Sequence, residues 1–169
     1  MIIIGEKING AIPSIKQAIA EKNEALIIER TLAQANAGAN FLDCAPSTAT
    51  EIEYETMVWL IGLMQGATNV PLCIDSPNAK LLARVIEEGH LNKPGMVNSV
   101  NEEGDKCETI FPLIAGTPWE VVGLTCDQEG IPADPAKKVD IAKRIIDKAV
   151  KYGVSLNQLH IDPCVMALA

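Results

Sequence analysis

The sequence is poor in aromatic residues and has no long apolar stretch. Phe, Trp and Tyr together make up 4% of the chain, so its core has to be built mostly from aliphatic side chains. No apolar run approaches the roughly 20 residues that cross a bilayer. The first residues, MIIIGEKING, lack the basic region and long apolar segment of a signal peptide. These absences predict a protein that neither enters nor is anchored to a membrane.

Basic residues are also scarce. The chain has 14 Lys and Arg against 22 Asp and Glu, which gives a net charge of −8 and a pI of about 4.7. Nucleic acids and anionic membranes are bound by basic faces, so this balance argues against both as partners.

Disulfide and zinc frameworks are missing as well. The cysteines number 5, an odd count, and no Cys-x-x-Cys pair occurs. A chain of 169 residues can build a core without cross-links. The pattern predicts free thiols, no metal site and a reducing, cytoplasmic location.

Short apolar runs are spread along the whole chain, and they are apolar at every position rather than at alternate ones. Strands of parallel sheets, which are buried on both faces, have this pattern. The runs occupy residues 2–4, 41–42, 70–74, 95–97, 121–124 and 159–161.

Helices are expected between these runs. The stretch 48–51, Thr-Ala-Thr-Glu, has the form of a capping box at the start of a helix that ends near Gly66. Ser76-Pro77 and Asp134-Pro135 each offer an N-cap residue followed by proline.

Two further helical features can be placed. The helix after Asp134 is expected to end near Gly153, and the first helical region, about residues 14–37, is expected to break near Asn23. The apolar positions of the helix after Asp134 are 139, 142, 145, 146, 149 and 150, which predicts that this face is buried.

Strands and helices therefore alternate without a linker, which predicts a parallel sheet with right-handed crossovers. An open doubly wound sheet and a (β/α)8 barrel both fit. Residues 5–10, Gly-Glu-Lys-Ile-Asn-Gly, do not match the G-x-G-x-x-G of dinucleotide-binding folds. Polar residues follow most strands, and a barrel gathers such residues around one mouth. We predict one α/β domain over residues 1–169, a TIM barrel of which only the first six strands are present.

Three polar residues at predicted strand ends are candidate ligands. Asp75 either binds a ligand or caps the next helix, and Asn98 follows two apolar residues and is expected to point into the mouth. Asp162 stands at the tip of the last strand, where it either binds a ligand or pairs with a lysine. His160 lies on the same side of that strand and is more simply a structural histidine.

These motifs, taken in order, resemble the pterin-binding methyltransferase family. The family includes methyltetrahydrofolate:corrinoid methyltransferases and dihydropteroate synthases, and the corrinoid-linked branch is the better match. The residues that carry the resemblance are 4–9 (IGEKIN), 72–76 (LCIDS), 96–101 (MVNSVN), 111–113 (FPL), 123–125 (GLT), 130–132 (GIP) and 161–163 (IDP).

The resemblance implies a site and a reaction. In this family two Asp and one Asn hold the pterin ring, here Asp75, Asn98 and Asp162. Further contacts are expected from Asn101, Glu6 and Asp43, and the resemblance assigns no catalytic residue. The implied reaction moves a methyl group between N5 of tetrahydrofolate and the cobalt of a corrinoid, or cobalamin, carried by a partner protein. A homodimer of the full-length protein is also implied.

The chain departs from the family in two ways. Ala45 replaces an Asn that family members often carry, which fits a branch that demethylates methylated amines, betaines or aryl ethers. Two strand-helix units of the barrel are missing, so a molecule of only these residues is expected to transfer methyl groups weakly or not at all. Two other functions stay open: a non-catalytic pterin-binding fragment, or a lyase or isomerase that binds Mg²⁺ through Asp43, Asp75 and Asp162.

Overall fold

The computed structural model describes residues 1–165, and within them the strands form one parallel sheet in which each strand pairs with the next along the chain. This order is that of a barrel, since an open doubly wound sheet reverses its strand order part-way. The strands are β1 (Ile4–Gly5), β2 (Phe41–Cys44), β3 (Leu72–Asp75), β4 (Met96–Glu102), β5 (Glu120–Asp127) and β6 (Leu159–Asp162).

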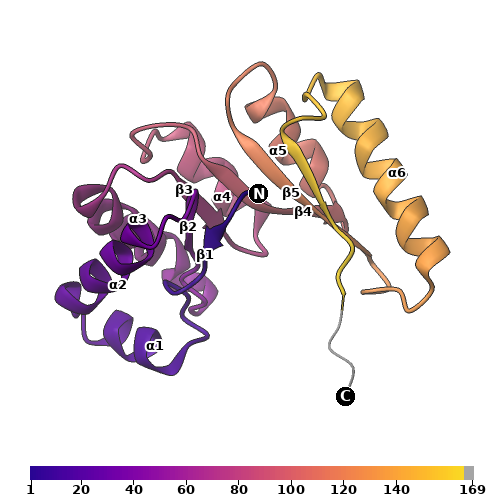
Figure 1. Ribbon diagram of the computed structural model, residues 1–169. Helices are drawn as coiled ribbons and strands as arrows, with labels where there is room; N and C mark the ends of the chain where they lie inside the picture. Colours follow the sequence, from indigo (N-terminus) through magenta and orange to yellow (C-terminus); the bar gives the residue numbers. More distant parts are fainter. Residues whose placement is uncertain (166–169) are drawn as a thin grey trace.

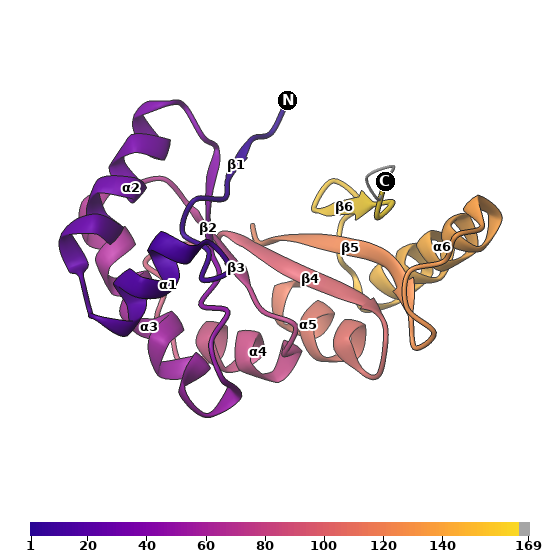
Figure 2. The ribbon, with the colours of Figure 1, turned by 90° about the horizontal axis from the view of Figure 1, so that it is seen from below.

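The helices cover one face of this sheet. They are α1 (Pro13–Ala20), α2 (Glu24–Asn36), α3 (Thr50–Ala67), α4 (Ala79–Glu87), α5 (Lys106–Ile114) and α6 (Pro135–Tyr152). Figure 1 shows them following the sheet from β1 (indigo) to β6 (yellow). In Figure 2 the sheet curls into an arc with the helices on its outer side and with β1 and β6 at its two ends. The predicted fold is confirmed: this is a curled, six-stranded part of a barrel.

Both faces of the sheet are apolar, which explains the continuous apolar runs of the sequence. On the outer face Leu42, Ile74 and Val97 are completely buried in the main core against the helices. On the inner, concave face Phe41, Cys73 and Met96 form a smaller buried cluster, with Ile4 and Val122 packed against it. Residues two positions further along the strands point to the same concave side. No helix of residues 1–165 is both long and apolar enough to span a bilayer.

Two of the predicted helix starts are wrong. Helix α3 begins at Thr50 with Ala49 at its N-cap position and no capping side chain, so residues 48–51 do not form a capping box. Helix α4 is capped by Asn78, whose side chain accepts a hydrogen bond from the Leu81 N–H. Ser76 lies too early to be the cap, since α4 begins at Ala79; its hydroxyl donates to the carboxylate of Glu53, at 2.6 Å, and accepts from the Asn78 N–H, at 3.0 Å.

Other helix predictions are confirmed. Asn23 separates α1 from α2 and caps α2, Asp134 caps α6, and Gly153 ends α6 in the left-handed conformation, with φ of 80°. The predicted buried face of α6 is partly wrong. Ile145 and Ala149 are buried as expected, but the third buried position is 141, and the valines at 139 and 150 are exposed. The buried face of α6 therefore begins at residue 141, whereas the sequence pattern predicted that it begins at residue 139.

One glycine holds the loops after β1 and β2 together. A Cβ on Gly10 would lie 2.0 Å from the carbonyl oxygen of Pro46. We expect Gly10→Ala to lower the free energy of unfolding by about 2–3 kcal/mol, because the clash is with backbone and one of the loops has to move. Gly66→Ala is the matched control, because Gly66 is inside α3 with open space around it. The control should raise stability by about 0.5–1 kcal/mol. Urea unfolding followed by circular dichroism measures both, and equal effects would contradict this view of Gly10.

Candidate functional site

Asp75, the last residue of β3, is the direct neighbour of Asn98, which lies in the first half of β4. The same row of the sheet continues through Val122 on β5 to His160 on β6. Asp75 lies two residues beyond Cys73 of the concave cluster, so its side chain points to the concave face, and paired residues of a parallel sheet share that face. The structure thus places the carboxyl group of Asp75 beside the amide of Asn98, facing the inside of the arc.

Asp162 lies on the same face, two residues beyond His160 and level with Leu124 of β5. It is therefore about 7 Å nearer to the carboxyl ends of the strands than the row of Asp75. Asp162 is exposed, and its Oδ1 accepts a hydrogen bond from the backbone N–H of Cys164 at 2.7 Å. The three predicted pterin ligands thus share one face, with Asp162 at the opposite end of the arc from β1.

Asp43 is the most buried carboxyl group of the site. Only 2% of its surface is exposed, and its Oδ1 has no hydrogen-bond partner among the described residues. Burial first, and then the negative charges of Asp75 and Glu6, raise the pKa of Asp43 to about 8, although a hydrogen bond from the Cys73 thiol acts in the opposite direction. Asp43 is therefore a neutral acid over most of the pH range below 8.

Asp75 also has a raised pKa, of about 6, caused first by burial and then by the charges of Glu6 and Glu53. Glu53 comes from α3 and is itself buried, with 6% of its surface exposed. The carboxyl groups near the ends of β1, β2 and β3 thus form one coupled group. Two of its members, Asp43 and Asp75, change protonation within about one pH unit of neutrality.

Asn101 is placed differently from the other predicted ligands. It is buried, its amide nitrogen donates to Cys126 Sγ at 3.1 Å, and its Oδ1 accepts from the Glu103 N–H at 3.0 Å. Both ends of the side chain are thus bonded within the protein. Glu6 is exposed at the end of β1, close enough to influence both aspartates.

His160 is held by the protein rather than free. Its Nε2 lies 2.5 Å from the carboxylate of Glu120 on the neighbouring strand. Glu120 is level with Met96, one row closer to the amino ends of the strands. This pairing agrees with the structural role expected for the histidine.

The sequence prediction missed two members of the site. Glu53 gives no signal because it lies inside a helix, and Cys73 reads simply as a buried strand residue. Within residues 1–165, no three His, Cys, Asp or Glu side chains come together in a way that could hold a metal ion. The predicted Mg²⁺ set of Asp43, Asp75 and Asp162 is therefore not assembled here.

A curled parallel sheet with acidic and amide side chains at its carboxyl ends defines a protein of the barrel class with a polar ligand site. The chain belongs to the pterin-binding enzyme family, whose family model matches residues 11–168. It is 49% identical to a methylcorrinoid:tetrahydrofolate methyltransferase of Eubacterium limosum over all of this chain and 62% of that protein. It is 28% identical to the methionine synthase of Mycobacterium tuberculosis over all of this chain and 15% of the synthase.

The fold is also that of solved structures. A dihydropteroate synthase from Xanthomonas albilineans, in complex with 7,8-dihydropteroate, superposes with a TM-score of 0.66 at 21% identity, covering 96% of this chain and 58% of the synthase. The chain thus spans less than two thirds of the relatives that it resembles. The family and the barrel fold predicted from the sequence are confirmed.

Proposed function

We propose that this chain binds tetrahydrofolate on the concave face of its sheet and takes part in methyl transfer from a corrinoid carried by a partner protein. The observation that carries this proposal is the adjacent pair Asp75 and Asn98, facing the same side as Asp162. The likeness to the Eubacterium limosum methyltransferase supports the direction, since that protein's name puts the methyl group first on the corrinoid.

The residue types suit a reduced pterin ring. Such a ring carries an exocyclic amine and ring N–H donors beside acceptor nitrogen and oxygen atoms. A carboxylate accepts two neighbouring N–H groups in one charge-assisted pair, which is the role of Asp75. The amide of Asn98 both donates and accepts hydrogen bonds, so it matches an edge of the ring that carries a donor beside an acceptor. Asp162 accepts a hydrogen bond from the ring on the side opposite Asp75. Asn101 does not contact the ring in this scheme, because both ends of its amide are already bonded within the protein.

In the proposed step, N5 of tetrahydrofolate attacks the methyl group on cobalt. The N5–C bond forms, the cobalt–carbon bond breaks, and its two electrons stay on cobalt. The proton on N5 has to leave, and we assign its acceptance to the exposed carboxylate of Glu6, because Asp75 already accepts N–H groups of the ring. Asp43 stays protonated at neutral pH, so it adds no second negative charge beside Asp75. Positioning and electrostatics carry the rate in this scheme.

Calorimetry with tetrahydrofolate tests the binding half of the proposal, and micromolar or tighter affinity is expected. Mixing the protein with tetrahydrofolate and a methylated corrinoid protein tests the transfer half, with 5-methyltetrahydrofolate detected by mass spectrometry. Absence of folate binding would overturn the proposal. Binding without any methyl product would restrict this chain to folate recognition, which is the non-catalytic, pterin-binding alternative that the sequence left open.

The affinity should also depend on pH. Asp75 accepts N–H groups only when ionised, and its pKa is about 6. Lowering the pH from about 7 to about 5 should therefore weaken tetrahydrofolate binding by about tenfold. Asp75→Asn, which cannot ionise, should bind more weakly throughout and lose this part of the pH dependence. Parallel calorimetric titrations of the two proteins measure the difference, and matching pH profiles would argue against a role for the Asp75 charge.

A further inference from the structure

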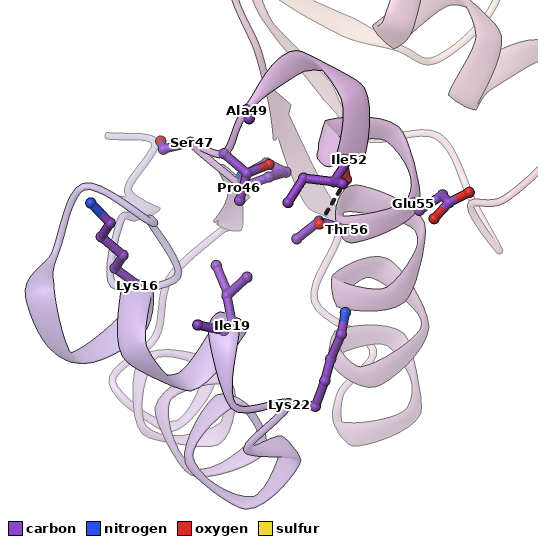
Figure 3. A pocket seen from close by; sticks show the side chains of 11 residues that line it. Lys16, Ile19, Lys22, Pro46, Ser47, Ala49, Ile52, Glu55 and Thr56 are labelled. Carbon is purple, nitrogen blue, oxygen red and sulfur yellow. Dashed lines mark hydrogen bonds between the residues drawn. The ribbon is translucent and has the colours of Figure 1, made fainter.

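A cavity of about 520 Å³ lies outside the site described above, between α1, the loop of residues 46–49 after β2, and the first turns of α3. Figure 3 shows Lys16 on the α1 side and Lys22 next to α3, with the apolar side chains of Ile19 and Ile52 between them. Glu55 also lines the cavity, but in Figure 3 its carboxylate points away from it, on the far side of α3. The cavity therefore combines an apolar wall with two cations.

The two lysines of the cavity have no carboxylate at ion-pairing distance among the described residues. The ammonium of Lys22 instead lies 4.1 Å from the ring centroid of Trp59. Other cations of the chain do pair with carboxylates, for example Lys137 and Arg144 on α6. In a chain with a net charge of −8, two unpaired lysines beside one cavity form a local positive site.

A hydroxyl group adds to this arrangement. Thr48 lines the cavity, and its Oγ1 is buried without a hydrogen-bond partner among the described residues. Buried hydroxyls are normally bonded, so an unpaired one beside a cavity indicates a missing partner. The first turn of α3 starts just after it, with no side chain capping its N–H groups.

The cavity adjoins the pterin site. The loop of residues 46–49, which lines the cavity, begins three positions after Asp43 and is hydrogen-bonded to the loop after β1. The backbone of Ala45 pairs with that of Asn9, and the Ser47 hydroxyl donates to Asn9 Oδ1 at 3.3 Å. This loop therefore lies at the ends of β1 and β2, a few residues from the strand end that carries Asp43.

Resting on the proposed function, we propose that this cavity receives the p-aminobenzoyl-glutamate tail of the folate substrate. The tail joins an aromatic ring, which fits the wall of Ile19 and Ile52, to carboxylates, which fit Lys16 and Lys22. The concave face itself is acidic, so it repels the tail carboxylates and accepts only the pterin ring. The cavity is thus a second, cationic subsite for the same molecule. Longer γ-glutamyl tails place more carboxylates at it.

The experiment compares two ligands by calorimetry: tetrahydrofolate, which carries the tail, and 6-methyltetrahydropterin, which lacks it. The double variant Lys16→Gln/Lys22→Gln should bind tetrahydrofolate about tenfold more weakly. It should bind 6-methyltetrahydropterin like the wild type. Lys143→Gln/Lys151→Gln, the same charge change on α6, is the matched control and should bind both ligands normally. Thr48→Val should weaken only tetrahydrofolate binding, by about threefold, without loss of thermal stability.

The outcomes separate this inference from the proposed function. If the wild type binds 6-methyltetrahydropterin and the lysine variants do not alter tetrahydrofolate affinity, the tail subsite is wrong and the proposed function stands. Equal losses for both ligands, or a loss in the α6 control, would also overturn the subsite. If the wild type binds neither ligand, the proposed function and the inference both fail. Raising the salt to about 1 M should reduce the advantage of tetrahydrofolate over 6-methyltetrahydropterin in the wild type, since it screens the lysine charges.

Discussion

Asp75→Ala is expected to reduce the affinity of this protein for tetrahydrofolate by about 100-fold. The ionised carboxylate pairs with N–H groups of the pterin in a partly buried position, and such charge-assisted hydrogen bonds contribute about 3 kcal/mol. The loss is large because the N–H groups of the ligand are then buried without partners. Calorimetry with 6-methyltetrahydropterin should show the same factor, because the contact is to the ring and not to the tail.

Two further variants show how large the effect of Asp75→Ala is by comparison. Asp162→Ala should cost less, about tenfold, because Asp162 is exposed and water can replace the lost bond. Asp140→Ala removes an exposed carboxylate of α6 and should leave binding unchanged. Wild-type affinity in the Asp75 variant, or a loss of the same size in the α6 control, would remove Asp75 from the site.

Much of the fold is predictable from the sequence because a short apolar run marks each strand. Short strands such as β2, with four buried residues, need only an apolar pattern and a polar residue at the tip. Helix starts are predicted less well because several residues compete to be the cap. Ser76 looks like a cap, but its hydroxyl binds the buried carboxylate of Glu53 and the N–H of Asn78, while the Asn78 side chain caps α4. That competition is between segments far apart in the sequence.

The site too was predictable only in part. Asp75, Asn98 and Asp162 were predicted because each follows an apolar run, and the register of the sheet places them on one face. The protonation of the site could not be predicted, because it depends on how closely the carboxyl groups approach and how deeply they are buried. Asp43 reads in the sequence as one more strand-end acid, and only the structure shows it to be the most buried.

The cavity beside α1 was not predicted at all. It is lined by ordinary lysine, threonine and aliphatic residues from three segments, and none of these segments contains a recognisable motif. Its charge becomes visible only when the ion pairs of the folded chain are known. A sequence pattern reports which residues are available, whereas a pocket depends on which of them remain unpaired after folding.

Replacing Asp43 with asparagine should make the stability of the protein less dependent on pH. In the folded protein the pKa of Asp43 is about 8, well above the value of about 4 for an exposed aspartate. Below pH 4 the side chain is protonated in both states, and its burial has no ionisation cost. As the pH rises from 4 to 8, the unfolded chain releases this proton while the folded chain retains it, so the stability of the wild type falls.

The variant has no such proton to lose. Its stability relative to the wild type should therefore rise by about 3–5 kcal/mol between pH 4 and pH 8.5. The comparison cancels the carboxyl groups that do not interact with Asp43, because both proteins contain them. Urea unfolding at the two pH values measures the difference, and Asp140→Asn, at an exposed position of α6, serves as the control with no expected change. A constant stability difference between the Asp43 variant and the wild type would mean that Asp43 is ionised in the folded protein at neutral pH. The carboxyl group would then place a second negative charge beside Asp75 on the concave face.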